Sequence, residues 1–228
     1  MKFAFRILLL LLLPTLSPAQ DAMQTINELT AKMNLINDYS VNAVIRSDIP
    51  FIKILPVKAT IYFKQKDKFR IKSKSIAILP KQGFTDLSTL LNKKGSYTAV
   101  ANGSEMYSNT NAAMVIILPV SDTSDLTMAR LWIDTENDII LKSQITTRSS
   151  GTIMIEYTYG AQKQIGLPDN VVITVDVKKF KIPKGVATDI NRNSETDEKK
   201  PPGKTGKVFI KFTDYVINKG ISDDIFTK

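Results

Sequence analysis

The sequence lacks the residue types that carry most catalytic and metal chemistry. It contains no His and no Cys, so the commonest general base, the thiolate nucleophile and the usual zinc ligands are missing. A Ser–Lys pair or a carboxylate pair remains possible. The adjacent carboxylates Asp223 and Asp224, however, are typical of an exposed turn near a chain end. We therefore expect no catalytic residue, no metal site and no cofactor, and an enzyme is the least favoured class.

Two short motifs resemble functional signatures without completing them. Gly203-Lys204-Thr205 is similar to the end of a phosphate-binding loop, but Glu198 stands where that loop needs a Gly. Asn102-Gly103-Ser104 fits the glycosylation pattern, yet these residue types are equally typical of a turn. Neither motif predicts a site.

The first residues have the order of a secretory signal. Lys2 and Arg6 precede an apolar run from Ile7 to Leu13, and small residues in Ser17-Pro18-Ala19 place a cleavage site ahead of Gln20. The run is too short to cross a bilayer, which takes about 20 apolar residues. We expect residues 1–19 to be removed and residues 20–228 to form one soluble β domain. Because the chain has no Cys, it needs no oxidising compartment, and the bacterial periplasm is the simplest setting.

The charge is basic, with a formal net value of +9 that includes Lys2 and Arg6 of the signal. A solvated basic surface explains this charge, and attraction to anionic lipid head groups or to acidic partners is the sharper alternative. Nucleic acid is not an expected partner, because the Lys residues alternate along predicted strands and export separates the protein from DNA.

The periodicity of apolar residues predicts a sheet with a few helices. Residues 21–37 and 84–94 have the three- and four-residue spacing of amphipathic helices. Residues 57–64 and 69–72 alternate apolar and polar side chains around the turn Lys66-Asp67-Lys68, which indicates a hairpin with one face toward an interior. Further strands are predicted at 112–120 (buried on both faces), 130–134, 139–147, 153–159, 171–181 and 207–217, with loops or irregular strands at 75–83 and 101–112 and a long polar loop at 187–206.

These elements predict a mainly β fold, a strongly curved antiparallel sheet of roughly eight to eleven strands with two or three helices against it. Their order, together with the short motifs Leu131-Trp132-Ile133-Asp134, Ile155-Glu156-Tyr157-Thr158-Tyr159-Gly160 and Gly166-Leu167-Pro168, resembles the periplasmic outer-membrane lipoprotein carrier (LolA-like) family. In that resemblance the initial helix ends at Tyr39-Ser40. The sequence departs from the family pattern in the 187–206 loop and in the segment from Ile49 to Leu55.

The resemblance implies an incomplete, half-open antiparallel β-barrel whose concave apolar side is lidded by helices. It implies lipid acyl chains or a lipoprotein as partners, inner- and outer-membrane lipoprotein-sorting proteins as further partners, and a monomer. The absence of a Cys for lipid attachment makes the chain similar to the soluble carrier of the family. The family has a functional Arg that aligns with no residue here, and Arg46 is the candidate for its role.

The expected ligand-binding residues lie on the concave face and on the helical lid, with Met available to adapt to irregular partners. Alternation places the apolar side chains of the 57–72 hairpin on the concave side, and Lys58, Lys64, Arg70 and Lys72 toward water. Two alternatives stay open: a regulatory or scaffold protein of the same fold that binds a protein partner, and an enzyme with a polar cleft. The expected ligand-binding residues are Met23, Ile26, Met33, Val57, Ile61, Phe63, Phe69, Phe84, Leu87, Leu91, Val115 and Ile117.

Overall fold

The computed structural model describes residues 18–50, 55–65, 68–75, 84–176 and 205–227. Outside the described residues lie residues 1–17 of the predicted signal 1–19, the predicted turn residues 66 and 67, residues 76–83 of the predicted loop and residues 187–204 of the long polar loop. Within the described residues, no helix is long and apolar enough to cross a membrane.

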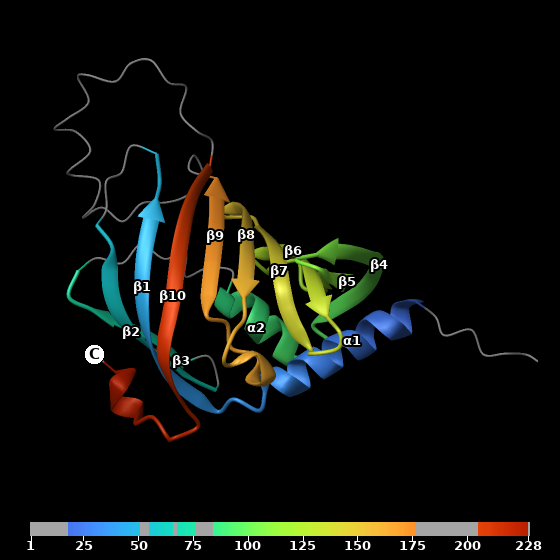
Figure 1. Ribbon diagram of the computed structural model, residues 1–228. Coiled ribbons are helices and arrows are strands. Elements are labelled where there is room, and N and C mark those ends of the chain that lie inside the picture. Colours follow the sequence, from blue (N-terminus) through green and yellow to red (C-terminus); the bar gives the residue numbers. More distant parts are fainter. Residues whose placement is uncertain (1–17, 51–54, 66–67, 76–83, 177–204, 228) are drawn as a thin grey trace, which may run out of the picture.

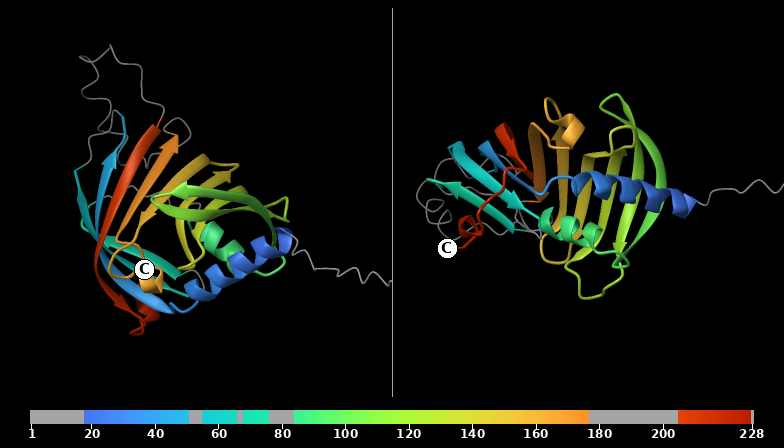
Figure 2. Two further views of the ribbon diagram at one scale, coloured as in Figure 1. Left: turned by 45° about the vertical axis from the view of Figure 1, so that its right-hand side comes forward. Right: turned by 90° about the horizontal axis from the view of Figure 1, so that it is seen from below.

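The protein is built on one antiparallel sheet of ten strands in the order β3-β2-β1-β10-β9-β8-β7-β6-β5-β4. Strands β3 and β4 are the two edges, so the sheet curls without closing (Figure 2). The predicted fold class is therefore confirmed. The strands are β1 (Asp38–Asp48), β2 (Val57–Lys64), β3 (Lys68–Ser73), β4 (Tyr97–Tyr107), β5 (Thr110–Pro119), β6 (Leu126–Asp134), β7 (Ile139–Thr147), β8 (Gly151–Thr158), β9 (Asn170–Asp176) and β10 (Thr205–Ile217).

Two α-helices, α1 (Pro18–Met33) and α2 (Phe84–Asn92), lie on the concave side of the sheet (Figures 1 and 2). The apolar side of α1 packs on β4, and α2 packs on β6. Ile26 and Leu29 of α1 and Leu87 and Leu91 of α2 are buried together with the inward side chains of the strands. The amphipathic spacing read from the sequence is the cause of this arrangement, because each helix can bury only one stripe.

The structure corrects three expectations at the level of elements. Helix α1 ends at Met33 rather than near residue 37 or at Tyr39-Ser40, and residues 38–48, for which we predicted no strand, form β1 between β2 and β10. Strand β5 is not buried on both faces: Val115 and Ile117 are buried, whereas Leu118 is 40% exposed. The prediction of loop or irregular strand at 101–112 agrees with the structure for residues 101–107, which are the irregular end of β4 beyond a register shift between Ala101 and Ser104.

The C-terminal residues fasten the corner between α1 and β1. The side-chain oxygen of Asn218 accepts a hydrogen bond from the Asn37 N–H at 2.7 Å, and its amide donates to the Leu35 carbonyl at 2.9 Å. Farther on, the carboxylate of Asp223 forms ion pairs with Lys64 at 2.7 Å and Lys68 at 2.8 Å. The chain end is therefore attached to the β2–β3 hairpin.

Candidate ligand-binding cavity

A cavity of about 690 Å³ opens on the concave side of the sheet. Its described walls come from β1–β3 and β7–β10, with the C-terminal half of α1, helix α2 and the turn η1 (Lys163–Ile165) around them. Strands β4, β5 and β6 contribute none of the described lining residues, because α1 and α2 cover them. The volume is within the range of about 300–1,000 Å³ that is usual for small-molecule pockets.

The lining is predominantly apolar, with aromatic rings and few polar groups. The Tyr39 ring stacks on Phe63 with centroids 5.2 Å apart and meets Tyr215 edge-on at 5.8 Å. Such a surface favours a long apolar ligand, because burial of apolar area is the main gain in free energy. The described lining residues are Leu29, Lys32, Met33, Ile36, Tyr39, Ile61, Phe63, Phe69, Arg70, Ile71, Leu87, Ser88, Leu91, Asp138, Ile139, Ile140, Ile145, Tyr157, Tyr159, Ile165, Gly166, Leu167, Pro168, Val171, Ile210, Phe212 and Tyr215.

Two of the tyrosine hydroxyls around the cavity, those of Tyr159 and Tyr215, donate to backbone carbonyls. Tyr159 donates to the Ile140 carbonyl at 2.7 Å, and Tyr215 donates to the Pro168 carbonyl at 2.7 Å. Burial raises the pKa of Tyr39 and of Tyr157 to about 12, and it also raises the pKa of Tyr215. These hydroxyls therefore stay neutral near neutral pH and do not supply a general base.

A β-bulge brings Tyr215 into the cavity. The register between β1 and β10 shifts between Ser40 and Asn42, opposite a point where Asp214 has a φ of +58°. Strict alternation after Phe212 would turn Tyr215 to the outer face, but the extra residue changes the phase of the strand. Phe212 and Tyr215 consequently both line the cavity.

One end of the cavity is polar, where the last turn of α1 meets the β6–β7 turn. The Lys32 ammonium donates to the Asn137 carbonyl, and Asp138 lines the cavity beside it. Lys32 also passes close to Gly166, where an added Cβ would lie 3.6 Å from Lys32 Cε. Gly166 has a φ of +83°, which a residue with a side chain adopts only with strain.

Six of the twelve predicted ligand-binding residues line this cavity. The other described ones, Met23, Ile26, Val57, Val115 and Ile117, do not: four of these five are buried in the core, and Met23 packs against it. Phe84 begins α2, and its side chain lies outside the described part of the structure. The six lining residues are Met33, Ile61, Phe63, Phe69, Leu87 and Leu91.

Of the basic side chains expected to face water, Lys58 and Lys72 are exposed and Lys64 pairs with Asp223. Arg70 differs in part: it is among the lining residues, although its guanidinium donates to the Thr227 carbonyl. The expectations also omitted the cavity tyrosines. Tyr157 and Tyr159 continue the inward alternation of Ile153 and Ile155, so that signal was present in the sequence.

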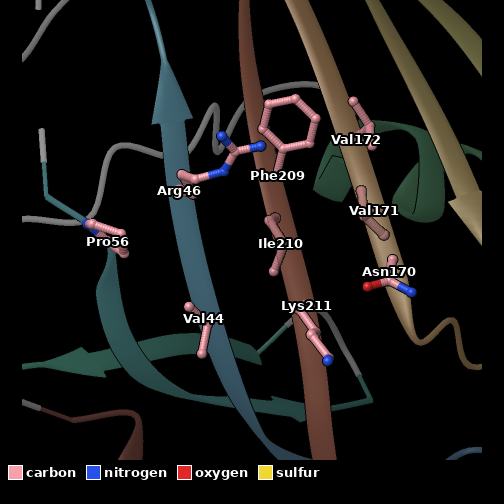
Figure 3. A pocket seen from close by; sticks show the side chains of 9 residues that line it. All are labelled: Val44, Arg46, Pro56, Asn170, Val171, Val172, Phe209, Ile210 and Lys211. Carbon is pink, nitrogen blue, oxygen red and sulfur yellow. The ribbon is translucent and has the colours of Figure 1, made fainter. Parts of the chain in front are cut away.

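A second, shallower groove of about 360 Å³ lies on the convex face over β1, β10 and β9 (Figure 3). Arg46 and Phe209 are register partners, and the Arg46 guanidinium lies 4.2 Å from the centre of the Phe209 ring. Val44 and Lys211 are paired in the next outward positions along the same two strands. The groove is therefore apolar with two cations on it, and it faces away from the cavity.

The sequence matches no protein-family model and no curated protein sequence. Solved structures nevertheless share its fold. A DUF1329 family protein from Desulfovibrio piger superposes with a TM-score of 0.60 at 10% identity, covering 92% of this chain and 98% of that one. A LolA superfamily protein from Nitrosomonas europaea superposes with a TM-score of 0.56 at 11% identity, covering 91% and 97%. The fold is LolA-like.

A third structure, an outer membrane lipoprotein-sorting protein domain from Vibrio parahaemolyticus, agrees with this result. It superposes on this chain with a TM-score of 0.62 at 9% identity, covering 92% of this chain and 97% of its own. The resemblance read from the sequence motifs is therefore confirmed for the fold. Identities near 10% carry the fold alone, and the function has to be argued from the cavity.

Proposed function

We propose that this protein is a periplasmic carrier that binds the acyl chains of a lipid or lipoprotein in the concave cavity. The observation that carries the proposal is the apolar, tyrosine-lined cavity of about 690 Å³ beneath α1 and α2. A filled core would not need this space, and an enzyme would need converging polar groups in it.

The energetics of such a site fit reversible transport. Each buried methylene contributes about 0.8 kcal/mol, so ten of them contribute roughly 8 kcal/mol. This corresponds to a Kd of about 1 µM before the cost of association is subtracted. The cost of association makes the net affinity of a ten-methylene contact weaker than this, and a weak net affinity permits the release that a carrier needs.

The experiment compares two equally exposed apolar residues on opposite faces of the sheet. Phe69 lines the cavity and Val44 lies on the convex face, and each is 40% exposed. We expect Phe69→Glu to weaken the binding of an oleoyl lipid at least tenfold, measured by displacement of a fluorescent fatty-acid analogue, and Val44→Glu to leave it within twofold.

Circular dichroism first establishes that both variants fold. Equal loss of binding in the two folded variants, or no binding of any acyl ligand by the unaltered protein, would overturn the carrier proposal. Mass spectrometry of lipid that co-purifies with the protein provides an independent readout.

The convex groove favours a second candidate function, in which the protein binds an acidic segment of a protein partner and acts as a regulator or scaffold. Arg46 presents a planar guanidinium beside an apolar floor, which suits a carboxylate next to an apolar side chain. A photo-reactive residue at position 46 would then crosslink to protein, whereas one at position 69 would crosslink to lipid if the carrier proposal holds.

A further inference from the structure

Two cations, Lys32 and Arg70, are among the described lining residues of the cavity, and neither has an ion-pair partner within the described part of the chain. Arg70 donates to the Thr227 carbonyl near the C-terminus, whereas Lys32 lies at the β6–β7 turn. Among the described residues, no carboxylate lies within ion-pair distance of its ammonium, which donates one hydrogen bond to the neutral Asn137 carbonyl. The neighbouring Lys163, in contrast, pairs with Asp134 at 3.4 Å. An ammonium has three donors, so Lys32 keeps donors for a ligand.

The position of Lys32 keeps a positive charge at the wall of the cavity. The side chain is partly buried and lines the cavity, so its charge is less hydrated than that of a fully exposed Lys. It also belongs to the last turn of α1, where the negative end of the helix dipole stabilises the ammonium, although the same dipole end does not itself attract an anion. The cation is thus held in place by the fold while an apolar volume opens next to it.

The cavity has a polar end and an apolar end along strand β7. Asp138 and Lys32 mark the polar end, and Ile145, farther along β7, lines the cavity with Leu87 and Leu91 of α2. Ile145 lies seven positions after Asp138, a span of roughly 23 Å at about 3.3 Å per residue. An amphiphile lying along this axis would have its headgroup at Lys32 and its chain under α2.

We propose that Lys32 binds the anionic headgroup of the ligand, a carboxylate or a phosphate, and that the cavity therefore selects acidic amphiphiles over neutral ones. This inference rests on the proposed carrier function. Asp138 opposes it in part, because its carboxylate lies at the same end of the cavity and repels an anion. The selectivity is accordingly set by the balance of these two side chains.

The test uses three oleoyl ligands with one chain and different headgroups: oleate, oleoyl lysophosphatidic acid and neutral oleyl alcohol. Lys32→Met keeps most of the apolar stem and removes the charge. We expect it to weaken an anionic ligand about tenfold, which is 1.4 kcal/mol, and to leave oleyl alcohol within twofold. Lys32→Arg should retain most of the anion affinity, and Asp138→Asn should increase it.

Lys58→Met is the matched control, because it removes the same charge from an exposed position on the convex face. Weaker binding of both anions supports the proposal and shows that the site accepts either headgroup. Weaker binding of oleate alone identifies a carboxylate site, and weaker binding of oleoyl lysophosphatidic acid alone identifies a phosphate site. An unchanged ratio of anion to alcohol affinity in Lys32→Met, or an equal loss in Lys58→Met, overturns it. If the unaltered protein binds none of the three ligands, the carrier function fails and the headgroup proposal fails with it.

Discussion

The carboxylate of Asp134 accepts two hydrogen bonds from Asn137, one from its backbone N–H at 3.2 Å and one from its side-chain amide at 2.8 Å. Asp134 is only 2% exposed, and it also accepts the Glu136 N–H at 3.1 Å. A buried carboxylate therefore organises the β6–β7 turn. This turn presents the Asn137 carbonyl to the Lys32 ammonium, so the position of Lys32 at the polar end of the cavity depends on Asp134.

Asp134→Asn should destabilise the protein by about 2–3 kcal/mol, because one side-chain oxygen is replaced by an amide donor that faces N–H groups. Lys163→Met should cost less than about 1 kcal/mol, since Lys163 is 41% exposed and its ion pair is partly screened. Urea unfolding of the two variants measures the difference. If the two variants lose the same stability, the ion pair with Lys163, and not the hydrogen bonds within the turn, accounts for the contribution of Asp134.

Leu91 and Ile117 separate the roles of cavity and core. Both are buried, but only Leu91 lines the cavity. Ile117→Ala should cost about 2–5 kcal/mol of stability and leave acyl-chain affinity unchanged. Leu91→Ala should enlarge the cavity and shift the preference toward longer or branched chains, as measured with a series of fatty acids. A change of ligand preference in a folded Ile117→Ala variant would contradict this prediction and show that Ile117 belongs to the binding site.

Acid should loosen the C-terminal segment. Hydrogen bonds from Lys64 and Lys68 lower the pKa of Asp223 to about 2. Because the pKa is lowered in the folded protein, Asp223 stabilises the fold at pH values above the ordinary Asp pKa of about 3.9. This stabilisation disappears as the pH falls toward 2. Asp223→Asn should therefore be less stable than the unaltered protein at neutral pH, and the difference should shrink below pH 4. Asp224→Asn, one residue on, serves as the control in urea titrations.

Alkali should act through the tyrosines of the cavity. The pKa of Tyr39 and of Tyr157 is raised to about 12 by burial, whereas an unfolded tyrosine ionises near pH 10. The stabilisation from these two groups is complete below pH 10 and is lost as the pH rises toward 12. Tyr157→Phe should reduce this loss. Tyrosinate absorbance, followed together with circular dichroism, checks it: ionisation of Tyr157 near pH 10 in a folded chain would contradict the prediction.

The sequence predicts the sheet well where alternation is regular. The β2–β3 hairpin and the β7–β8 pair were expected at nearly the observed positions, because one face of each strand is buried and the period of two is unbroken. Strand β1 was missed although Val41, Ala43 and Ile45 alternate, since it follows α1 closely with no Pro or Gly to mark a boundary.

The site was harder to predict than the fold. Ile61 and Ile117 are equally apolar and both buried, yet only Ile61 lines the cavity. The difference is tertiary: the two helices cover β4–β6 and leave β1–β3 open, and no local pattern encodes where a helix comes to rest. Tyr215 was missed for a different reason, because a single bulge at Asp214 reverses the facing of every residue after it.

The place of β1 in the sheet has a consequence for how the protein is made. β1 pairs on one side with β2, its neighbour in sequence, and on the other side with β10, which begins only at Thr205. A chain growing from its N-terminus therefore carries β1 with an unpaired edge until nearly all of its residues have been synthesised. Contacts of such long sequence separation form slowly, and unpaired strand edges in a partly folded chain promote aggregation. We expect the nascent chain to need a chaperone until β10 arrives, and early termination ahead of Thr205 to yield aggregates instead of a smaller folded protein.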